Sequence, residues 1–292
     1  MAATILDGKQ LASQIRQSVS AEIEALRART GRRPKLVAIL ATQDPGANLY
    51  AGSQKKACAN VGIDFELISA PSSSSQADLL DLIDRLNSDP AVSGIMLHVP
   101  LPTGVDQMTL QSRILPEKDV EATGPTSLGL LVHRKAALLP STPAAAFELA
   151  RMSGVPMEGA RAVVIGRSVV VGKPLTLMLT DAHCTVTVCH TRTRDLPAVA
   201  RQADFLFVAA GRPRIVGPDY IKPGAVVVDV GINQVTEPGP DGQEVTRTVG
   251  DVDFALASEV AGYITPVPGG VGPVTVALLL RNILTAARQT GK

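Results

Sequence analysis

A chain of 292 residues is long for a single hydrophobic core, so its length predicts two domains. Hydrophobic residues make up 45% of the chain and charged residues 19%, a balance that excludes an intrinsically disordered protein. The net charge of +1, with 3% aromatic residues and no tryptophan, argues against a nucleic-acid partner.

The composition also bears on the compartment. The N-terminal residues lack the pattern of a signal peptide, and we expect no apolar run long enough to span a bilayer, hence no membrane partner. Three cysteines, Cys58, Cys184 and Cys189, lie in apolar stretches without the spacing of metal ligands. They predict buried thiols in a reducing cytoplasm and no metal site.

The first half of the chain alternates between helical and strand patterns. Apolar residues recur every three or four positions in the helical segments, and short apolar runs separate them. Helices are predicted at 7–30, 47–61 and 76–87, and strands at 35–41, 65–69 and 93–99. This alternation predicts βαβ units, a mostly parallel sheet and an α/β fold.

The second half begins near Pro140 to Pro143, where we place the domain boundary. A helix is predicted at 144–152, followed by strands that begin at Arg161 and recur at 185–189, 205–209 and 225–230. The last twenty residues, 273–292, again show a helical pattern with an apolar face.

Val163 to Pro174 is the most informative stretch. A run of β-branched residues ends at Gly166, and Gly172 follows six positions later, which predicts a buried strand, a glycine turn and a helix. In that arrangement, free backbone N–H groups at the helix start bind the pyrophosphate of a dinucleotide. Ser168 stands where the usual motif has its middle glycine, so the motif alone is weak.

The residues after the next strand indicate which dinucleotide is bound. An NAD site needs a carboxylate there, whereas an NADP site needs cations and hydroxyls for the 2′-phosphate. The chain offers Thr191 and Arg192 at that point, with Arg167 in the glycine turn itself. We therefore expect NADP as the cofactor. The alternative is an ordinary strand–turn–helix beside a solvated basic loop.

Glycine and proline are dense in the segment 265–273. Without the polar spacers of a flexible linker, this density predicts a rigid loop whose backbone closely approaches a ligand. A stiff interdomain connector is the alternative reading.

Together these motifs resemble the bifunctional methylenetetrahydrofolate dehydrogenase/cyclohydrolase family. The resemblance runs along the whole chain and is most specific in the 265–275 loop. It rests on Gly166-Arg167-Ser168 with Gly172-Lys173-Pro174, on Cys189 to Thr193, Val228 to Asn233, Gly250-Asp251-Val252, Pro100-Leu101-Pro102 and Pro116 to Val120.

The resemblance implies a two-domain α/β homodimer. An N-terminal α/β folate or catalytic domain, 1–140, would be joined by the C-terminal helix 273–292, and a Rossmann-like NADP-binding domain would span 141–272. A tetrahydrofolate one-carbon derivative would bind in the cleft between them. NADP would be held by Gly166, Arg167, Ser168, Thr191, Arg192 and Ile232, and the substrate would be bound by Tyr50, His98, Pro100, Glu121, Pro268, Gly269 and Gly270.

The chain departs from the family in the catalytic half. The family has a lysine four residues after its tyrosine, whereas here Tyr50 is followed by Gln54, which cannot exchange a proton at neutral pH. Lys55 and Lys56 point in other directions around the predicted helix. Cyclohydrolase activity is therefore doubtful.

Two further substitutions fall in the same pocket. His98 replaces a glutamine, and Glu121, followed by Ala122 in place of glycine, replaces an aspartate that binds the pterin. We expect Tyr50, Gln54, His98 and Glu121 to be the catalytic group, with Glu121 keeping a carboxylate for the pterin. His98 is either a packed strand-end histidine or a proton carrier with a pKa near neutrality.

Four functions remain open from the sequence. The first is an NADP-dependent methylenetetrahydrofolate dehydrogenase with weak or absent hydrolysis. The others are a bifunctional enzyme assisted by His98, an oxidoreductase acting on another folate-like adduct, and an inactive protein that binds folate or NADP.

Overall fold

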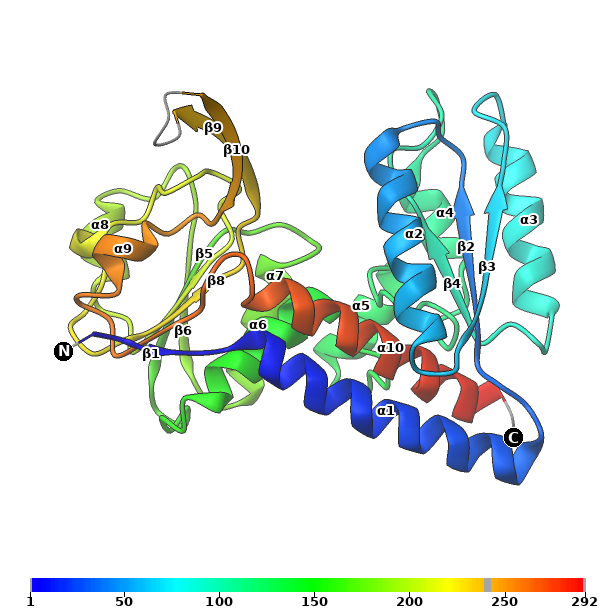
Figure 1. The fold of residues 1–292 in the computed structure, drawn as a ribbon, viewed down its shortest axis with the longest axis horizontal. Coiled ribbons are helices and arrows are strands. Elements are labelled where there is room, and N and C mark those ends of the chain that lie inside the picture. The colour runs from blue at the N-terminus through cyan, green and yellow to red at the C-terminus, as the bar shows by residue number, and fades with distance from the viewer. Residues whose placement is uncertain (1, 239–242, 291–292) are drawn as a thin grey trace. The chain divides into compact units, whose positions relative to one another are not determined.

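The computed structural model describes residues 2–238 and 243–290, which form two compact units (Figure 1). Residues 13–141 and 276–292 make up the three-stranded unit, and residues 1–12 and 142–275 make up the six-stranded unit.

The three-stranded unit contains a parallel sheet with the strand order β3-β2-β4. Its strands are β2 (Lys35–Leu40), β3 (Asp64–Ser69) and β4 (Gly94–Leu97). Its helices are α2 (Pro45–Ala59), α3 (Gln76–Ser88), α4 (Gln107–Arg113) and α5 (Pro125–Val132), together with most of α1 (Gly8–Thr30) and α10 (Val271–Thr290).

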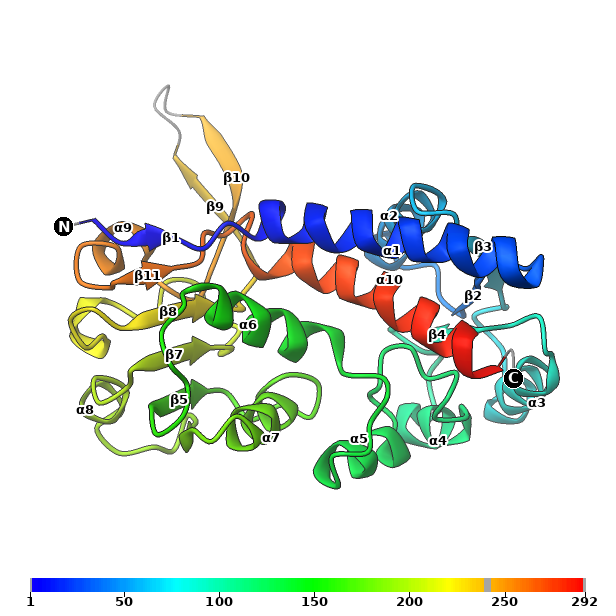
Figure 2. The ribbon, with the colours of Figure 1, turned by 90° about the horizontal axis from the view of Figure 1, so that it is seen from below.

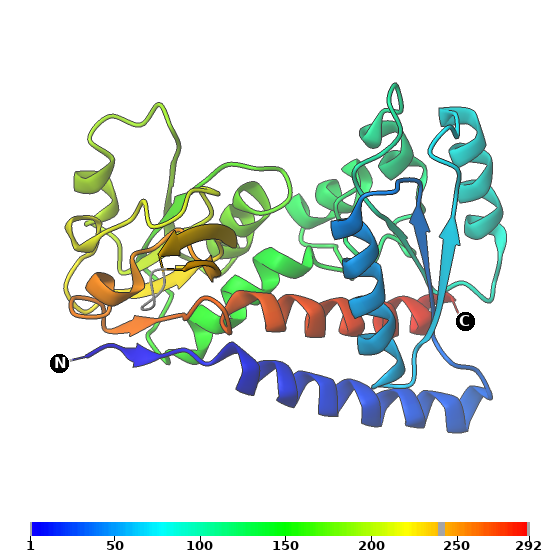
Figure 3. The same cartoon turned by 45° about the horizontal axis from the view of Figure 1, so that its top comes forward.

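Alternation along the strands explains how this sheet is covered. Successive strand residues point to opposite faces, so a strand covered on both faces is apolar along its buried length, as β2 is from Leu36 to Leu40. One face packs against α1 and α10, which run side by side (Figure 2), through Leu36, Ala38, Met96, Val19, Ile23, Leu280 and Ile283. The other face packs against α3 and α4 through Val37, Ile39, Ile95, Leu97, Leu79, Ile83 and Leu110. Figure 3 shows α2 and α3 on either side of the sheet.

The six-stranded unit is built on an all-parallel sheet with the order β1-β11-β8-β7-β5-β6. The strands are β1 (Thr4–Ile5), β5 (Arg161–Ile165), β6 (Thr185–Cys189), β7 (Phe205–Val208), β8 (Val226–Asp229) and β11 (Tyr263–Ile264). A hairpin of β9 (Asn233–Pro238) and β10 (Glu244–Val249) projects from this unit (Figure 1). The helices are α6 (Ser141–Met152), α7 (Gly172–Asp181), α8 (Leu196–Ala200), α9 (Phe254–Ala257) and a 3₁₀ turn at Pro218–Tyr220.

The predicted α/β class with parallel sheets is confirmed. The division of the chain differs from the expected one at its start, because residues 1–12 belong to the six-stranded unit. The reason is that β1 pairs in parallel with β11 and completes one edge of the larger sheet.

Helix α10 contradicts the expectation that no apolar run in the chain is long enough to span a bilayer. Its segment Val271–Gln289 is long and apolar enough to cross a bilayer by length and composition alone. However, 56% of its most apolar window is buried inside the protein, as in a core helix, so this one segment is weak evidence for a membrane span. The expected residues 291–292 of this helix lie outside the described residues.

Candidate functional site

Helix α2 places Tyr50 and Gln54 one turn apart. The Asp44 carboxylate caps the helix by accepting a hydrogen bond from the Ala47 amide at 2.8 Å, and Pro45 begins the first turn. The buried stripe of the helix consists of Ala47, Ala51, Gln54 and Cys58. Gln54 is 2% exposed, whereas Lys55 and Lys56 are exposed, so neither lysine takes its place in the pocket.

The Gln54 amide is only half satisfied. Its Nε2 donates to Met96 Sδ at 2.8 Å, and its Oε1 has no hydrogen-bond partner within the described residues. The sequence therefore places in the interior an amide oxygen that a ligand or water can satisfy, since an unpaired buried polar group is unfavourable by about 1–3 kcal/mol.

His98 follows the carboxyl end of β4 and lies beside α2, the helix that carries Gln54. Its backbone N–H donates to the Ile39 carbonyl at 2.9 Å, and its ring meets that of Tyr50 edge-on, with centroids 5.7 Å apart. His98 is 4% exposed, and its Nε2 has no partner among the described residues. Burial lowers the pKa of His98, so the imidazole is neutral at pH 7 and can accept a proton.

The segment that carries Glu121 is fixed against β4. The Ile95 amide donates to the Lys118 carbonyl at 2.8 Å, while the Lys118 ammonium donates to three carbonyls at the end of α3, those of Leu86, Asn87 and Asp89. The Asp119 carboxylate accepts hydrogen bonds from the Gly124 amide at 2.9 Å and the Ser127 hydroxyl at 2.7 Å. These bonds fix the backbone segment from which the Glu121 side chain projects.

Glu121 differs from the expected carboxylate in its protonation. Burial, followed by the charge of Asp119, raises the pKa of Glu121 to about 8, so without a ligand it holds a proton near neutrality. Burial, followed by the charge of Glu121, also raises the pKa of Tyr50, while a hydrogen bond with Gln54 opposes that rise. The structure therefore brings together Tyr50, Gln54, His98 and Glu121 in the three-stranded unit.

Two neighbours of these residues have unusual backbone geometry. Ala122 is fully buried and has a φ of 52°, a left-handed conformation that is strained for any residue with a Cβ. Pro100, a predicted substrate contact, is exposed and follows Val99 through a cis peptide bond.

In the six-stranded unit, Gly166 and Gly172 build the predicted turn between β5 and α7. Gly166 has a φ of 129°, and a Cβ there would lie 2.2 Å from the Ala209 carbonyl oxygen. A Cβ on Gly172 would lie 2.2 Å from the Gly166 carbonyl oxygen. Both positions therefore require glycine, because the backbone segments are in direct contact.

The donors in this turn are not those that the sequence predicted. The amides of Val171 and Gly172 at the helix start donate to the Ser168 hydroxyl, and the Lys173 amide donates to the Ser168 carbonyl. They are not free for a pyrophosphate. The amides of residues 167–170 make no hydrogen bond within the described part of the chain, so the available donors lie in the turn itself.

The basic turn after β6 lies next to the glycine turn. Ile165 pairs with Cys189, and the Gly166 amide donates to the Cys189 carbonyl at 2.9 Å, so the two turns leave the same edge of the sheet. Arg167, Thr191 and Arg192 are exposed there. This donor set fits a phosphorylated ribose.

Ile232 and the Gly/Pro loop share a small cavity in the same unit. The cavity of about 70 Å³ is lined by Ile232 and by residues of the loop that include Pro268, Gly269 and Gly270. Ile232 is 64% exposed at the carboxyl end of β8. The structure thus groups these residues, while Gly166, Arg167, Ser168, Thr191 and Arg192 gather at the β5 and β6 ends of the sheet.

Sequence reasoning missed two buried carboxylates that fix the loops around Ile232. The Asp251 carboxylate accepts hydrogen bonds from the amides of residues 210, 211 and 212 and from the Asn233 side chain, at 2.6–2.9 Å. The Asp229 carboxylate accepts from the amides of Gly231, Asp251 and Val252. Burial raises the pKa of Asp229 to about 6. In the sequence, the available sign of these buried carboxylates was that Asp229 and Asp251 each lie within a short apolar motif.

The part of the chain that the structure describes contains no cluster of metal-ligating side chains. No group of three or more His, Cys, Asp or Glu side chains there could hold an ion.

Comparison with known proteins matches both parts of the chain to one family. Residues 6–121 match the tetrahydrofolate dehydrogenase/cyclohydrolase catalytic domain, and residues 140–291 match the NAD(P)-binding domain of the same family. The Bifunctional protein FolD of Moorella thermoacetica is 46% identical over 289 residues, covering 99% of this chain and 100% of the relative. The Bifunctional protein FolD 2 of Frankia alni is also 46% identical, covering 100% and 98%.

A solved structure agrees with this match. The Trypanosoma brucei N5,N10-methylenetetrahydrofolate dehydrogenase-cyclohydrolase, complexed with NADP cofactor and inhibitor, superposes with a TM-score of 0.91 at 38% identity. The superposition covers 99% of this chain and 98% of the other.

Proposed function

The chain belongs to the tetrahydrofolate dehydrogenase/cyclohydrolase family, and from that membership we propose an NADP-dependent methylenetetrahydrofolate dehydrogenase. It would oxidise 5,10-methylenetetrahydrofolate to 5,10-methenyltetrahydrofolate as a cytoplasmic homodimer. The observation that carries this proposal is the pair of adjacent turns at the ends of β5 and β6. They combine Arg167, Thr191 and Arg192 with amides that have no partner among the described residues.

These residues supply what NADP requires. The amides of residues 167–170 would donate to the pyrophosphate, and the guanidinium groups would pair with the 2′-phosphate. Asp195, the acidic residue nearest along the basic turn, is committed to capping α8 by accepting from the Ala198 amide. When bound, the nicotinamide supplies the hydride acceptor for the folate methylene carbon.

Tyr50 and Glu121 would orient the substrate. The pterin ring presents N–H donors, and Glu121 would lose its proton on pairing with them, because a hydrogen-bonded carboxylate is favoured over a buried unpaired one. Ile232, Pro268, Gly269 and Gly270, in the six-stranded unit, would border the nicotinamide through backbone and apolar surface. Hydride transfer needs alignment of the reacting atoms more than acid–base help.

Hydrolysis of the methenyl product would be weak. The position that carries a lysine in the family is the buried Gln54, whose amide cannot titrate, and Lys55 and Lys56 face solvent. Loss of a positioned acid–base group typically lowers a rate by about 10²–10⁴.

A second function, a bifunctional enzyme assisted by His98, is favoured by one observation. The His98 imidazole is neutral and has an unpartnered Nε2 within the described residues of the same pocket, so it could accept a proton from attacking water. The relatives at 46% identity bear the name bifunctional.

One experiment separates these functions. Purified protein is mixed with methylenetetrahydrofolate and either NADP⁺ or NAD⁺, and the reduced cofactor, methenyltetrahydrofolate and 10-formyltetrahydrofolate are followed separately. We expect NADPH and methenyltetrahydrofolate to form together. Formyltetrahydrofolate produced above its spontaneous rate would establish the bifunctional reading, and tight folate binding without any NADPH would leave a binding protein.

A further inference from the structure

The three-stranded unit contains a cavity that none of the predicted site residues lines. It has a volume of about 510 Å³ and lies at the amino ends of β2 and β4, beside the last turns of α1 and α10. Tyr50 and His98 follow the opposite, carboxyl ends of those strands. The cavity is therefore separate from the proposed substrate pocket within this unit.

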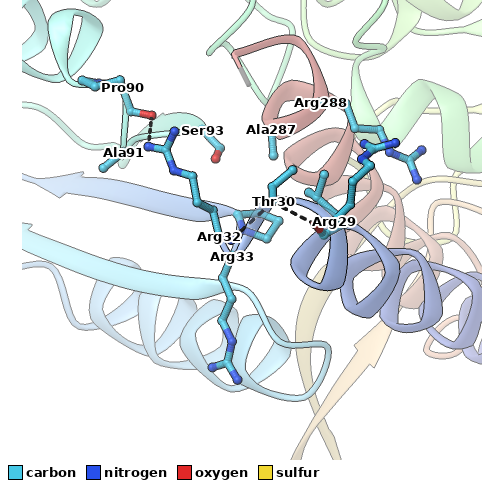
Figure 4. A pocket seen from close by; sticks show the side chains of 11 residues that line it. Arg29, Thr30, Arg32, Arg33, Pro90, Ala91, Ser93, Ala287 and Arg288 are labelled. Carbon is cyan, nitrogen blue, oxygen red and sulfur yellow. Dashed lines mark hydrogen bonds between the residues drawn. The ribbon is translucent and has the colours of Figure 1, made fainter. Parts of the chain in front are cut away.

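Among the described residues, every charged side chain that lines this cavity is an arginine, namely Arg29, Arg32, Arg33 and Arg288 (Figure 4). Arg288 pairs with Glu22 at 2.8 Å, and Arg33 makes a longer contact of 3.9 Å with Asp64. These carboxylates offset two of the four charges.

The other two arginines have no carboxylate partner in the described parts of the chain. Arg32 donates through Nη2 to the Pro90 carbonyl at 3.0 Å, a neutral acceptor, and Arg29 makes no ion pair there. The C-terminal end of α1 offsets about half a positive charge at most. More than one positive charge therefore remains uncompensated at the cavity.

The wall that positions Arg32 is rigid and adds a further donor. Figure 4 shows Arg32 reaching toward Pro90 and Ser93 while Arg33 turns the other way. The segment before Pro90 is held by the Lys118 ammonium, which donates hydrogen bonds to the Leu86, Asn87 and Asp89 carbonyls. Ser93 is 5% exposed; its oxygen accepts from the Lys35 amide, which leaves its hydroxyl proton to donate.

We propose that this cavity is a binding site for a phosphate dianion, either free phosphate or the phosphate group of a small metabolite, held by Arg32 and the Ser93 hydroxyl, with Arg29 adding positive charge from the helix side of the cavity. The guanidinium fork of Arg32 matches the oxygens of a phosphate, and charge-assisted bonds to the dianion offset the uncompensated positive charge of the cavity. The volume exceeds that of one phosphate, so it also accommodates the organic part of an ester.

Calorimetric titration tests the site with inorganic phosphate as the probe. Protein at low ionic strength and saturated with NADP⁺ is titrated as wild type, Arg29→Gln, Arg32→Gln and the control Arg27→Gln. Arg27 is on the same helix but pairs with Glu24 and does not line the cavity. We expect binding at one site, weakened at least about fivefold in the first two variants and less than twofold in the control.

Equal weakening in all three variants would mean diffuse surface charge and an adventitious ion only, and would overturn the proposal. Unchanged affinity in Arg29→Gln and Arg32→Gln would overturn it as well. Crystals soaked in phosphate give a second readout, with density expected beside Arg32 and Ser93. Tighter binding of glycerol phosphate than of phosphate would identify an ester as the ligand, and equal binding would identify free phosphate.

Discussion

Replacing Gln54 by lysine tests the central claim about the catalytic pocket. Gln54 is 2% exposed, with its Nε2 on Met96 Sδ and its Oε1 unpaired within the described residues. Lysine at this position would extend one atom further along the same path, toward the Tyr50 hydroxyl that Gln54 now contacts. Gln54→Met, of similar length and without a titratable group, is the matched control.

The expected magnitudes follow from burial and from the neighbours. Burial would lower the pKa of the new amine, so that it could exchange a proton near neutrality. A positioned acid–base group is worth about 10²–10⁴ in rate. Because the resemblance implies that His98 and Glu121 are substituted as well, we expect a smaller gain in hydrolysis, roughly 10- to 100-fold. Burying the amine should lower the free energy of unfolding by about 1–3 kcal/mol, whereas Gln54→Met should leave it equal or raise it by about 1 kcal/mol, since the unpaired oxygen is removed.

The assay follows methenyltetrahydrofolate consumption and NADPH formation in the same preparation, with unfolding in urea measured separately. Dehydrogenase kcat should change less than about threefold in both variants, because hydride transfer needs no proton carrier. A Gln54→Lys protein that folds, keeps its dehydrogenase rate and hydrolyses no faster than Gln54→Met would refute the reasoning.

Three further predictions concern other parts of the two units. Arg167→Ala should lower kcat/KM for NADP by about ten- to a hundredfold while changing that for NAD little; equal losses would remove Arg167 from the 2′-phosphate site. Glu121→Gln should raise the folate KM and leave the NADP KM unchanged. The pKa of Glu121 is raised from 4.5 to about 8 on folding, so it stabilises the wild type most at low pH, and the free energy of unfolding should fall as pH rises from about 5 to 8. That fall should be shallower in Glu121→Gln, and identical urea profiles across this range would show that Glu121 is ionised throughout. Asp251→Asn should lower the free energy of unfolding by roughly 2–4 kcal/mol, because four donors lose part of a fully buried acceptor. The control Asp253→Asn, at the half-buried N-cap of α9, should lower it by less than about 1 kcal/mol.

The elements with strong periodicity were predictable from the sequence. The strand over 185–189 has the bounds that the pattern predicted, and the helix expected at 76–87 is observed as α3, Gln76–Ser88. The shorter elements α4, α5, α8 and α9 and the β9–β10 hairpin were not predicted, since segments of four to eight residues contain too few turns to show a period. Strand β1 has only two residues and forms solely because β11 lies beside it.

The residue types and spacings of the candidate site are visible in the sequence, but the protonation of its side chains is not. Glycines, the basic turn, Gln54, His98 and Glu121 can be read directly as residue types at fixed spacings, and these positions fall within the two ranges that match the family. Protonation depends on surroundings that spacing does not show. Glu121 holds a proton because burial and Asp119 disfavour its charge, and His98 is neutral because it is buried.

The sequence by itself determined the alternation of strands and helices, the glycine turn and the absence of a lysine at position 54, because each is written in local residue order. Only the tertiary structure decided that Ser168 satisfies the amides at the start of α7, leaving those of residues 167–170 as donors. It also decided that Arg29, in the last turn of α1, and Arg32, just after that helix, line one cavity with Ser93, the residue before β4. Hydrogen bonds and charges of this kind depend on which segments fold against one another, and contacts between residues far apart in the chain leave no periodic signal in it.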